Sequence, residues 1–410
     1  MNPTVEAHSN KQAATHWLWL TVLLAVVVMA ATLLLLVVGA LRDPTRSLHA
    51  MLSSSVWTTV GPHIVLACLA GTVLSGIAYR YTTGRLSIVA LVLASAALVG
   101  ASAITFSIVS AVNAAGGVAN PISGLLIRSM TANGPDHVRT FATVNGEPLR
   151  AALYTPQLGQ EDAPVMLYIH GGGFKTGSFL ETDADLRWFA ERGWLVFSVE
   201  YRLFTDEVAT WDLAANDVAC AAAWISDVAA NYGGNMAQLA VLGDSAGGNL
   251  AINYAYRTAL GERYSDCHGD LPLPIGVVVQ YPAVDPLAIY HHGFAIPGFE
   301  PEMLVTGYLG GSPYTHPERV RAVSSYTYLT DKAPATLIIS PVQDSIVPSW
   351  SVLRFADHAR LAGVDIELVR VPFANHVYNQ LAANSLGNQA RRSLTERFLN
   401  RQMAATHIQQ

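Results

Sequence analysis

The stretch AVLGDSAGGNLA, residues 240–251, carries an apolar run into the pentapeptide GDSAG and then resumes an apolar pattern with helical spacing. That change of period predicts a sharp strand-to-helix turn that presents the Ser245 hydroxyl. So tight a turn excludes bulky side chains two positions before and two positions after the serine, and Gly243 and Gly247 occupy both. Because a serine hydroxyl needs an adjacent base to become a nucleophile, the stretch predicts a catalytic serine. An ordinary strand-to-helix turn is the alternative.

Residues 136–405 alternate strands with helices. Apolar strands are predicted at 163–170, 193–201, 238–244, 275–284, 335–344 and 366–373, after two strands at 137–144 and 149–155 that the turn NGEP joins. Apolar strands separated by helices predict an α/β fold with a mostly parallel, doubly wound sheet, covered on both faces. In such sheets reactive groups gather at the carboxyl ends of the strands.

The base and the acid that orients it are expected after the serine, each just past a strand. Asp344 follows one predicted strand and His376 follows the next. Asp285, one strand earlier, is the competing acid. His291 and His292 adjoin each other but have no partner at metal-ligand spacing. We therefore expect neither a metal nor a cofactor.

A second glycine-rich motif, HGGGF at residues 170–174, follows an upstream strand. Consecutive glycines with free N–H groups can surround an oxyanion, together with the N–H of Ala246. His170 is interpreted as holding this loop and not as the base. A flexible glycine turn is the alternative.

Five motifs in order, HGGGF, EYRL, GDSAGGN, SPVQDSIVP and ANHVYN, resemble the hormone-sensitive-lipase-type esterases of the α/β-hydrolase superfamily. The resemblance covers about residues 136–398, and the chain is also similar to feruloyl-esterase-like (BD-FAE) hydrolases. It implies hydrolysis of carboxylic esters by an α/β-hydrolase fold. The site it implies consists of the triad Ser245, Asp344 and His376 and the oxyanion-hole residues Gly172, Gly173 and Ala246.

Two departures from that family concern the substrate pocket. EYRL is followed by FTDEVATW and not by a proline-rich run, and the place of an N-terminal cap is taken by an apolar region. An inserted cap over the site is expected at about residues 286–328.

The apolar region predicts about three transmembrane helices. Residues 17–41 carry no charge over a length that can cross a hydrocarbon core of about 30 Å. A cleaved signal peptide and, for the later segments, a buried soluble hairpin are the alternatives. The expected parts are a tail at 1–16, helices at about 17–41, 57–79 and 86–112, and a linker at 113–135. Basic residues flank the spans three against three, so the orientation stays open.

Composition restricts the partners. Hydrophobic residues make up 51% of the chain and charged residues 13%, with a net charge of −6 and no long basic run. A nucleic-acid partner is therefore not expected, whereas a lipid bilayer is. Cys220 is interpreted as a small buried apolar residue, with a disulfide to Cys267 as the alternative. The sequence does not determine the oligomeric state.

Together these patterns predict a multi-pass protein of a bacterial cytoplasmic membrane. Its predicted activity is a serine carboxylesterase or lipase-like reaction on small or lipid-derived esters, through an acyl-enzyme. An amidase or peptidase, an acyltransferase, and a non-catalytic membrane sensor or scaffold are the alternatives.

Overall fold

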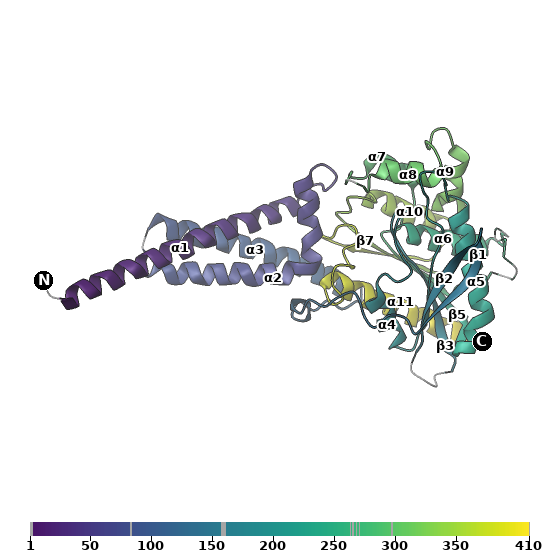
Figure 1. Ribbon diagram of the computed structural model, residues 1–410, viewed down its shortest axis with the longest axis horizontal. Helices are drawn as coiled ribbons and strands as arrows, with labels where there is room; N and C mark the ends of the chain where they lie inside the picture. The colour runs from purple at the N-terminus through teal and green to yellow at the C-terminus, as the bar shows by residue number, and fades with distance from the viewer. Residues whose placement is uncertain are drawn as a thin grey trace.

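The computed structural model consists of a long helical bundle joined to an α/β domain (Figure 1). It describes residues 3–409 except 83, 157–160, 263, 265, 268, 270 and 297, and the side chains of 3–10 and 406–409 lie outside the description.

Three helices form the bundle, and their bounds are α1 (Pro3–Ala40), α2 (Leu48–Tyr79) and α3 (Arg85–Ala114). Within the described residues these three are long and apolar enough to cross a membrane. Helix α1 begins inside the segment expected as a tail, and α2 begins well before residue 57. The side chain of Ser47 accepts a hydrogen bond from the N–H of Ala50, and this cap begins α2 earlier than its hydropathy indicated.

Small residues bring the bundle helices together. Along α3, Ala90, Ala94, Ala97 and Ala101 are fully buried. An added Cβ at Gly71 of α2 would lie within van der Waals contact of Ala94. Without bulk at these positions the backbones approach closely, which is the usual mode of packing between transmembrane helices.

Within the described residues, eight strands form one sheet in the order β1-β2-β4-β3-β5-β6-β7-β8. Strand β2 pairs antiparallel with both β1 and β4, and the other neighbouring strands pair parallel, so the predicted mostly parallel, doubly wound α/β sheet is confirmed. The bounds of the strands are β1 (His137–Val144), β2 (Glu147–Tyr154), β3 (Ala163–Ile169), β4 (Leu195–Val199), β5 (Gly234–Asp244), β6 (Gly276–Gln280), β7 (Thr336–Pro341) and β8 (Ile366–Val371).

Helices cover both faces of this sheet. One face packs on α5 (Leu213–Val228), α6 (Ala246–Ala259) and α10 (Ser349–Leu361). The other packs on α4 (Asp183–Ala190) and α11 (Leu386–Gln409). Alternate residues of one strand serve opposite faces, as Leu167 and Tyr168 do.

The bundle shares a hydrophobic core with the α4–α11 face. Trp57 of α2 and Val112 of α3 are fully buried in the cluster that contains Leu394 of α11. The bundle is therefore packed onto the α/β domain and not merely tethered to it.

Between β6 and β7 the chain forms three short helices, α7 (Pro286–His292), α8 (Pro301–Leu309) and α9 (Pro317–Val323). A 3-10 turn at Ser325–Tyr328 follows them. These helices stand together at one end of the sheet (Figure 1). Each begins with a proline in its first turn, where the missing N–H leaves no bond unmade.

Cys220 does more than fill the core. Its sulfur forms a disulfide with Cys267, and the two Cα atoms lie 5.2 Å apart. The preferred interpretation of Cys220 as only a small apolar residue is therefore wrong, although the residue is buried. Its helical, alanine-rich surroundings carried no sign of the loop that returns to it.

Candidate active site

Ser245 lies at the junction of β5 and α6, with φ 55° and ψ −115°. A Cβ on Gly243 would come within 2.2 Å of the carbonyl oxygen of Gly247, and one on Gly247 within 2.2 Å of the oxygen of Ile169. Both glycines are therefore required by close backbone approach. The left-handed φ of Ser245 is held by the bond from its N–H to the Gln280 carbonyl, at 2.9 Å.

The structure brings the three expected polar side chains together. His376 Nε2 lies 3.0 Å from Ser245 Oγ, and His376 Nδ1 lies 2.9 Å from Asp344 Oδ2. Because a carboxylate only accepts, Nδ1 carries the proton, which leaves Nε2 of the neutral ring free to accept from the serine.

Asp344 is itself held in place. Its Oδ1 accepts the N–H groups of Ile346 at 2.9 Å and Val347 at 2.8 Å. Its side chain is 1% exposed and that of His376 is 5% exposed. A buried carboxylate that is held by backbone hydrogen bonds keeps the His376 imidazole in one orientation.

The glycine loop lies beside the serine. A Cβ on Gly171 would stand 3.4 Å from the Cβ of Ser245. Gly173 and Ala246 line the same cavity as the serine, whereas Gly172 is not among the lining residues. In the described part of the chain, the N–H groups of Gly172, Gly173 and Ala246 make no backbone hydrogen bond outside regular secondary structure.

His170 is not part of the hydrogen-bonded chain formed by Ser245, His376 and Asp344. Its Nδ1 donates to the carbonyl of Gly171 at 2.7 Å, and its ring stacks on Tyr201 with 4.4 Å between centroids. Burial lowers the pKa of His170 to about 4, so the ring is neutral at pH 7. It braces the glycine loop in this form.

The rejected candidates have other partners. Asp285 caps α7 by accepting from the N–H groups of Leu287 and Ala288. His291 contacts Tyr314. Among the described residues, no group of three or more His, Cys, Asp or Glu side chains could hold a metal ion.

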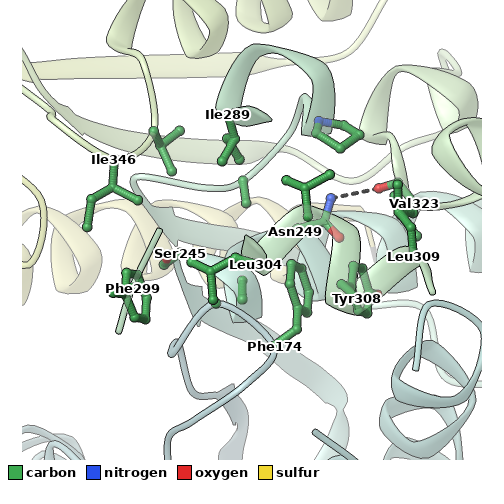
Figure 2. A pocket seen from close by; sticks show the side chains of 16 residues that line it. Phe174, Ser245, Asn249, Ile289, Phe299, Leu304, Tyr308, Leu309, Val323 and Ile346 are labelled. Atoms are coloured by element: carbon green, nitrogen blue, oxygen red, sulfur yellow. Dashed lines mark hydrogen bonds between the residues drawn. The ribbon is translucent and has the colours of Figure 1, made fainter. Parts of the chain in front are cut away.

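Ser245 opens into a narrow apolar cavity of about 40 Å³. Figure 2 shows side chains of the inserted helices around it, among them Ile289, Leu304 and Tyr308. Phe174 of the glycine loop stacks on Tyr308 with 3.7 Å between ring centroids. Ser245 is only 8% exposed at the wall of this cavity, whereas the sequence predicted a more exposed hydroxyl.

A buried ionic network lies directly behind the serine, and sequence reasoning missed it. Asp244 Oδ2 accepts from Tyr168 and Gln380 and lies 3.2 Å from Nη2 of Arg391. Arg391 also pairs with Asp185 at 2.6 Å. Burial raises the pKa of Asp244, and the guanidinium opposes that shift. A charged residue inside a tight turn was the only sign of this network in the sequence.

The fold and the serine turn together define a protein of the α/β-hydrolase class. A family model, BD-FAE, matches residues 152–357. The chain belongs to the BD-FAE family.

Curated relatives carry hydrolase names. The chain is 24% identical to Lipase 2 of Moraxella sp. over 61% of its own length and 64% of that protein. It is 35% identical to Esterase LipI of Mycobacterium tuberculosis over 27% of its length and 35% of that protein. To the ethyl acetate hydrolase of Pseudomonas putida it is 27% identical, over 62% of its length and 79% of that protein. The matches to the first two relatives thus span between about a third and two thirds of their length.

Solved structures of Thermogutta terrifontis esterase 2 share the fold. The apo form superposes with a TM-score of 0.55 at 21% identity, covering 66% of this chain and 96% of that chain. The form phosphonylated by sarin gives 0.55 at 22% identity with the same coverage.

Proposed function

We propose that this protein hydrolyses carboxylic esters through an acyl-enzyme on Ser245. One observation carries the proposal, namely the unbroken line from Ser245 Oγ through the His376 ring to the Asp344 carboxylate, with steps of 3.0 and 2.9 Å. Relatives named as esterases and lipases support the carboxylic ester as the bond that is cleaved.

In the acylation step, Ser245 Oγ attacks the ester carbonyl carbon while His376 Nε2 takes its proton. The Asp344 carboxylate stabilises the resulting imidazolium through its bond to Nδ1–H. His376 then returns the proton to the leaving alcohol. In the second half, His376 Nε2 takes a proton from water as the water oxygen attacks the acyl carbon. The bond from the acyl carbon to Ser245 Oγ then breaks, and His376 returns the proton to Oγ, which releases the acid and the free serine hydroxyl.

The tetrahedral intermediates carry a negative oxygen. The N–H of Ala246, at the start of α6, is suited to bind it because the N-terminal end of a helix carries positive partial charge. The N–H groups of Gly172 and Gly173 complete the proposed oxyanion hole. In enzymes of known mechanism, removal of one such donor raises the barrier by about 3 kcal/mol.

The cavity indicates the acyl group. Its lining is mostly apolar, with Ser245, Asn249 and Tyr308 as the residues that carry polar groups, and the described lining holds no charged residue. The amide nitrogen of Asn249 is already bonded to the Val323 carbonyl, as the dashed line in Figure 2 marks. A cavity this narrow and apolar favours a short, uncharged acyl chain. One relative named an ethyl acetate hydrolase agrees with that size.

Full-length protein in detergent tests this activity with p-nitrophenyl esters from acetate to palmitate and with a fluorophosphonate probe. We expect labelling of Ser245, the highest kcat/KM on short chains, and a loss of at least ~10³-fold in Ser245→Ala. Absence of labelling in the wild type, or labelling that survives Ser245→Ala, would contradict the triad. A preference for palmitate would contradict the acyl assignment only.

The protein is further proposed to be anchored in a membrane by α1–α3, with the α/β domain on the oxidising side. The disulfide supports this side, since structural disulfides are rare in reducing compartments. The start of α1 lies at the end of the bundle remote from the α/β domain (Figure 1), so it faces the opposite side.

Two lysines test the orientation. Lys11 is exposed near the start of α1 and Lys332 is exposed on the α/β domain. A membrane-impermeant amine reagent added to spheroplasts should modify Lys332 and spare Lys11, and lysis should expose both. Modification of Lys11 alone in intact spheroplasts would indicate the opposite orientation. Equal modification of both lysines there would contradict the proposed membrane anchoring. Lys332→Arg identifies the labelled peptide.

A further inference from the structure

The loop that carries His376 rests on the first turns of α2. Thr58 Oγ1 of that helix donates to the carbonyl oxygen of Tyr378 at 2.9 Å, across a separation of 320 residues. Both residues are buried. A helix expected only to anchor the chain thus contacts the loop that holds the base.

Asn375 lies at the centre of this contact and is 2% exposed. Its Oδ1 accepts from the backbone N–H of Ser345 at 2.8 Å and of His376 at 2.7 Å. Its Nδ2 donates to the carbonyl of Met51 and to Ser55 Oγ, both at 3.1 Å. All hydrogen-bonding positions of the amide are used. The amide cannot be flipped, because two backbone donors face one end and a carbonyl oxygen faces the other.

These four bonds join three segments. Ser345 follows Asp344 and His376 follows Asn375, so one amide oxygen fixes the acid loop relative to the base loop. The amide nitrogen fixes both loops to α2. A displacement of about 1 Å in a reacting group costs on the order of 10²-fold in rate, so the position of this amide bears directly on the reaction.

The composition of α2 agrees with such a role. Its first turns contain the run SSSVWTT, residues 53–59, before the helix becomes apolar. Ser54 and Thr58 are fully buried, and Ser55 is half-buried. The hydroxyls of Ser55 and Thr58 contact the His376 loop, whereas that of Ser54 donates to the Met51 carbonyl of its own helix.

We propose that Asn375 is a positioning residue for the Asp344–His376 pair and that the first turns of α2 form part of the active-site scaffold. The inference rests on the proposed ester hydrolysis. It makes the membrane helix a component of catalysis: α2 holds the base at its working distance from the serine.

The experiment compares matched variants of the full-length protein. Ser55→Ala/Thr58→Val removes two α2 hydroxyls and leaves Asn375 in place. Ser107→Ala/Thr72→Val makes the same chemical changes where each hydroxyl bonds only its own helix, at Ala103 and Cys68. Asn375→Ala removes all four bonds, and Thr58→Ser retains the hydroxyl.

Each variant is assayed for kcat and KM on a short p-nitrophenyl ester, for the rate of fluorophosphonate labelling, and for Tm. We expect kcat and the labelling rate to fall about tenfold in Ser55→Ala/Thr58→Val and about 10²-fold in Asn375→Ala, with KM unchanged. The Ser107→Ala/Thr72→Val control and Thr58→Ser should match the wild type.

The outcomes separate the two proposals. Wild-type kcat in Ser55→Ala/Thr58→Val would overturn the α2 role, and so would a fall in Tm without a change in kcat. Equal losses in the Ser107→Ala/Thr72→Val control would do the same. If Asn375→Ala fails to fold, the α2 pair and its control decide alone. A wild type that neither labels nor hydrolyses esters would overturn the ester hydrolysis itself, and this inference with it.

Discussion

Removing the disulfide gives the sharpest test of how this domain is stabilised. Cys220 lies on α5 and Cys267 in the loop after α6, with a sequence separation of 47. The closed loop contains β5, Ser245 and α6. The perturbation is the double substitution Cys220→Ala/Cys267→Ala, or reduction of the wild type.

The magnitude follows from the loop length. For a loop of this length, the lost chain entropy of the unfolded state corresponds to about 4 kcal/mol at 25 °C. A second contact keeps the native segments together without the bond: Asn216 exchanges hydrogen bonds with Asp266 at 3.1 and 2.8 Å. The native geometry should therefore persist, and the loss should come mainly from the unfolded chain. A domain of this size would lose roughly 8–16 °C in Tm.

Tm is measured in detergent at one scan rate, with and without reductant, because unfolding of such proteins is often irreversible. Reductant should lower the Tm of the wild type to that of Cys220→Ala/Cys267→Ala and leave the variant unaffected. Cys68→Ala, at the buried free thiol of α2, is the control and should keep the reductant response. A double variant within about 2 °C of the wild type would refute the loop-entropy argument.

Three further changes test the site. Gly243→Ala should lower the rate of fluorophosphonate labelling of Ser245 by at least ~10²-fold, because the new Cβ would stand 2.2 Å from the Gly247 oxygen. Arg391→Met should cost about 3–5 kcal/mol by leaving buried Asp244 uncompensated. Since the folded-state pKa of Asp244 is already raised and would rise further, the variant's stability should fall as pH increases from about 4, the unfolded value, through the raised folded value. Leu304→Ala should widen the cavity and shift preference about tenfold toward longer acyl chains.

Two of these changes have a matched control. Gly76→Ala introduces a Cβ with nothing within 4 Å and should leave labelling intact. Leu361→Ala removes a leucine that is 87% exposed and should not alter chain-length preference. Normal labelling in Gly243→Ala, a Tm deficit in Arg391→Met that shrinks at high pH, or an unchanged ester profile in Leu304→Ala would each contradict the corresponding argument.

Much of the architecture was readable from local pattern. Continuous apolar strands separated by helices predicted the parallel sheet, and chain order indicated which strand ends carry Ser245, Asp344 and His376. Those three groups meet because the carboxyl ends of parallel strands share one edge. Hydropathy located three apolar helices, although it placed the start of α2 too late, since polar turns of a helix do not differ in hydropathy from a loop.

The sequence by itself determined the order of the elements, the glycine-bounded turn and the polar groups that follow each strand, because each depends on residues close together in the chain. Only the tertiary structure decided the Cys220–Cys267 bond, the buried Arg391 network and the contact of Asn375 with α2. Those contacts join residues between 47 and 324 positions apart. Whether a distant amide, thiol or guanidinium finds a partner depends on which faces pack together, and no local periodicity encodes that.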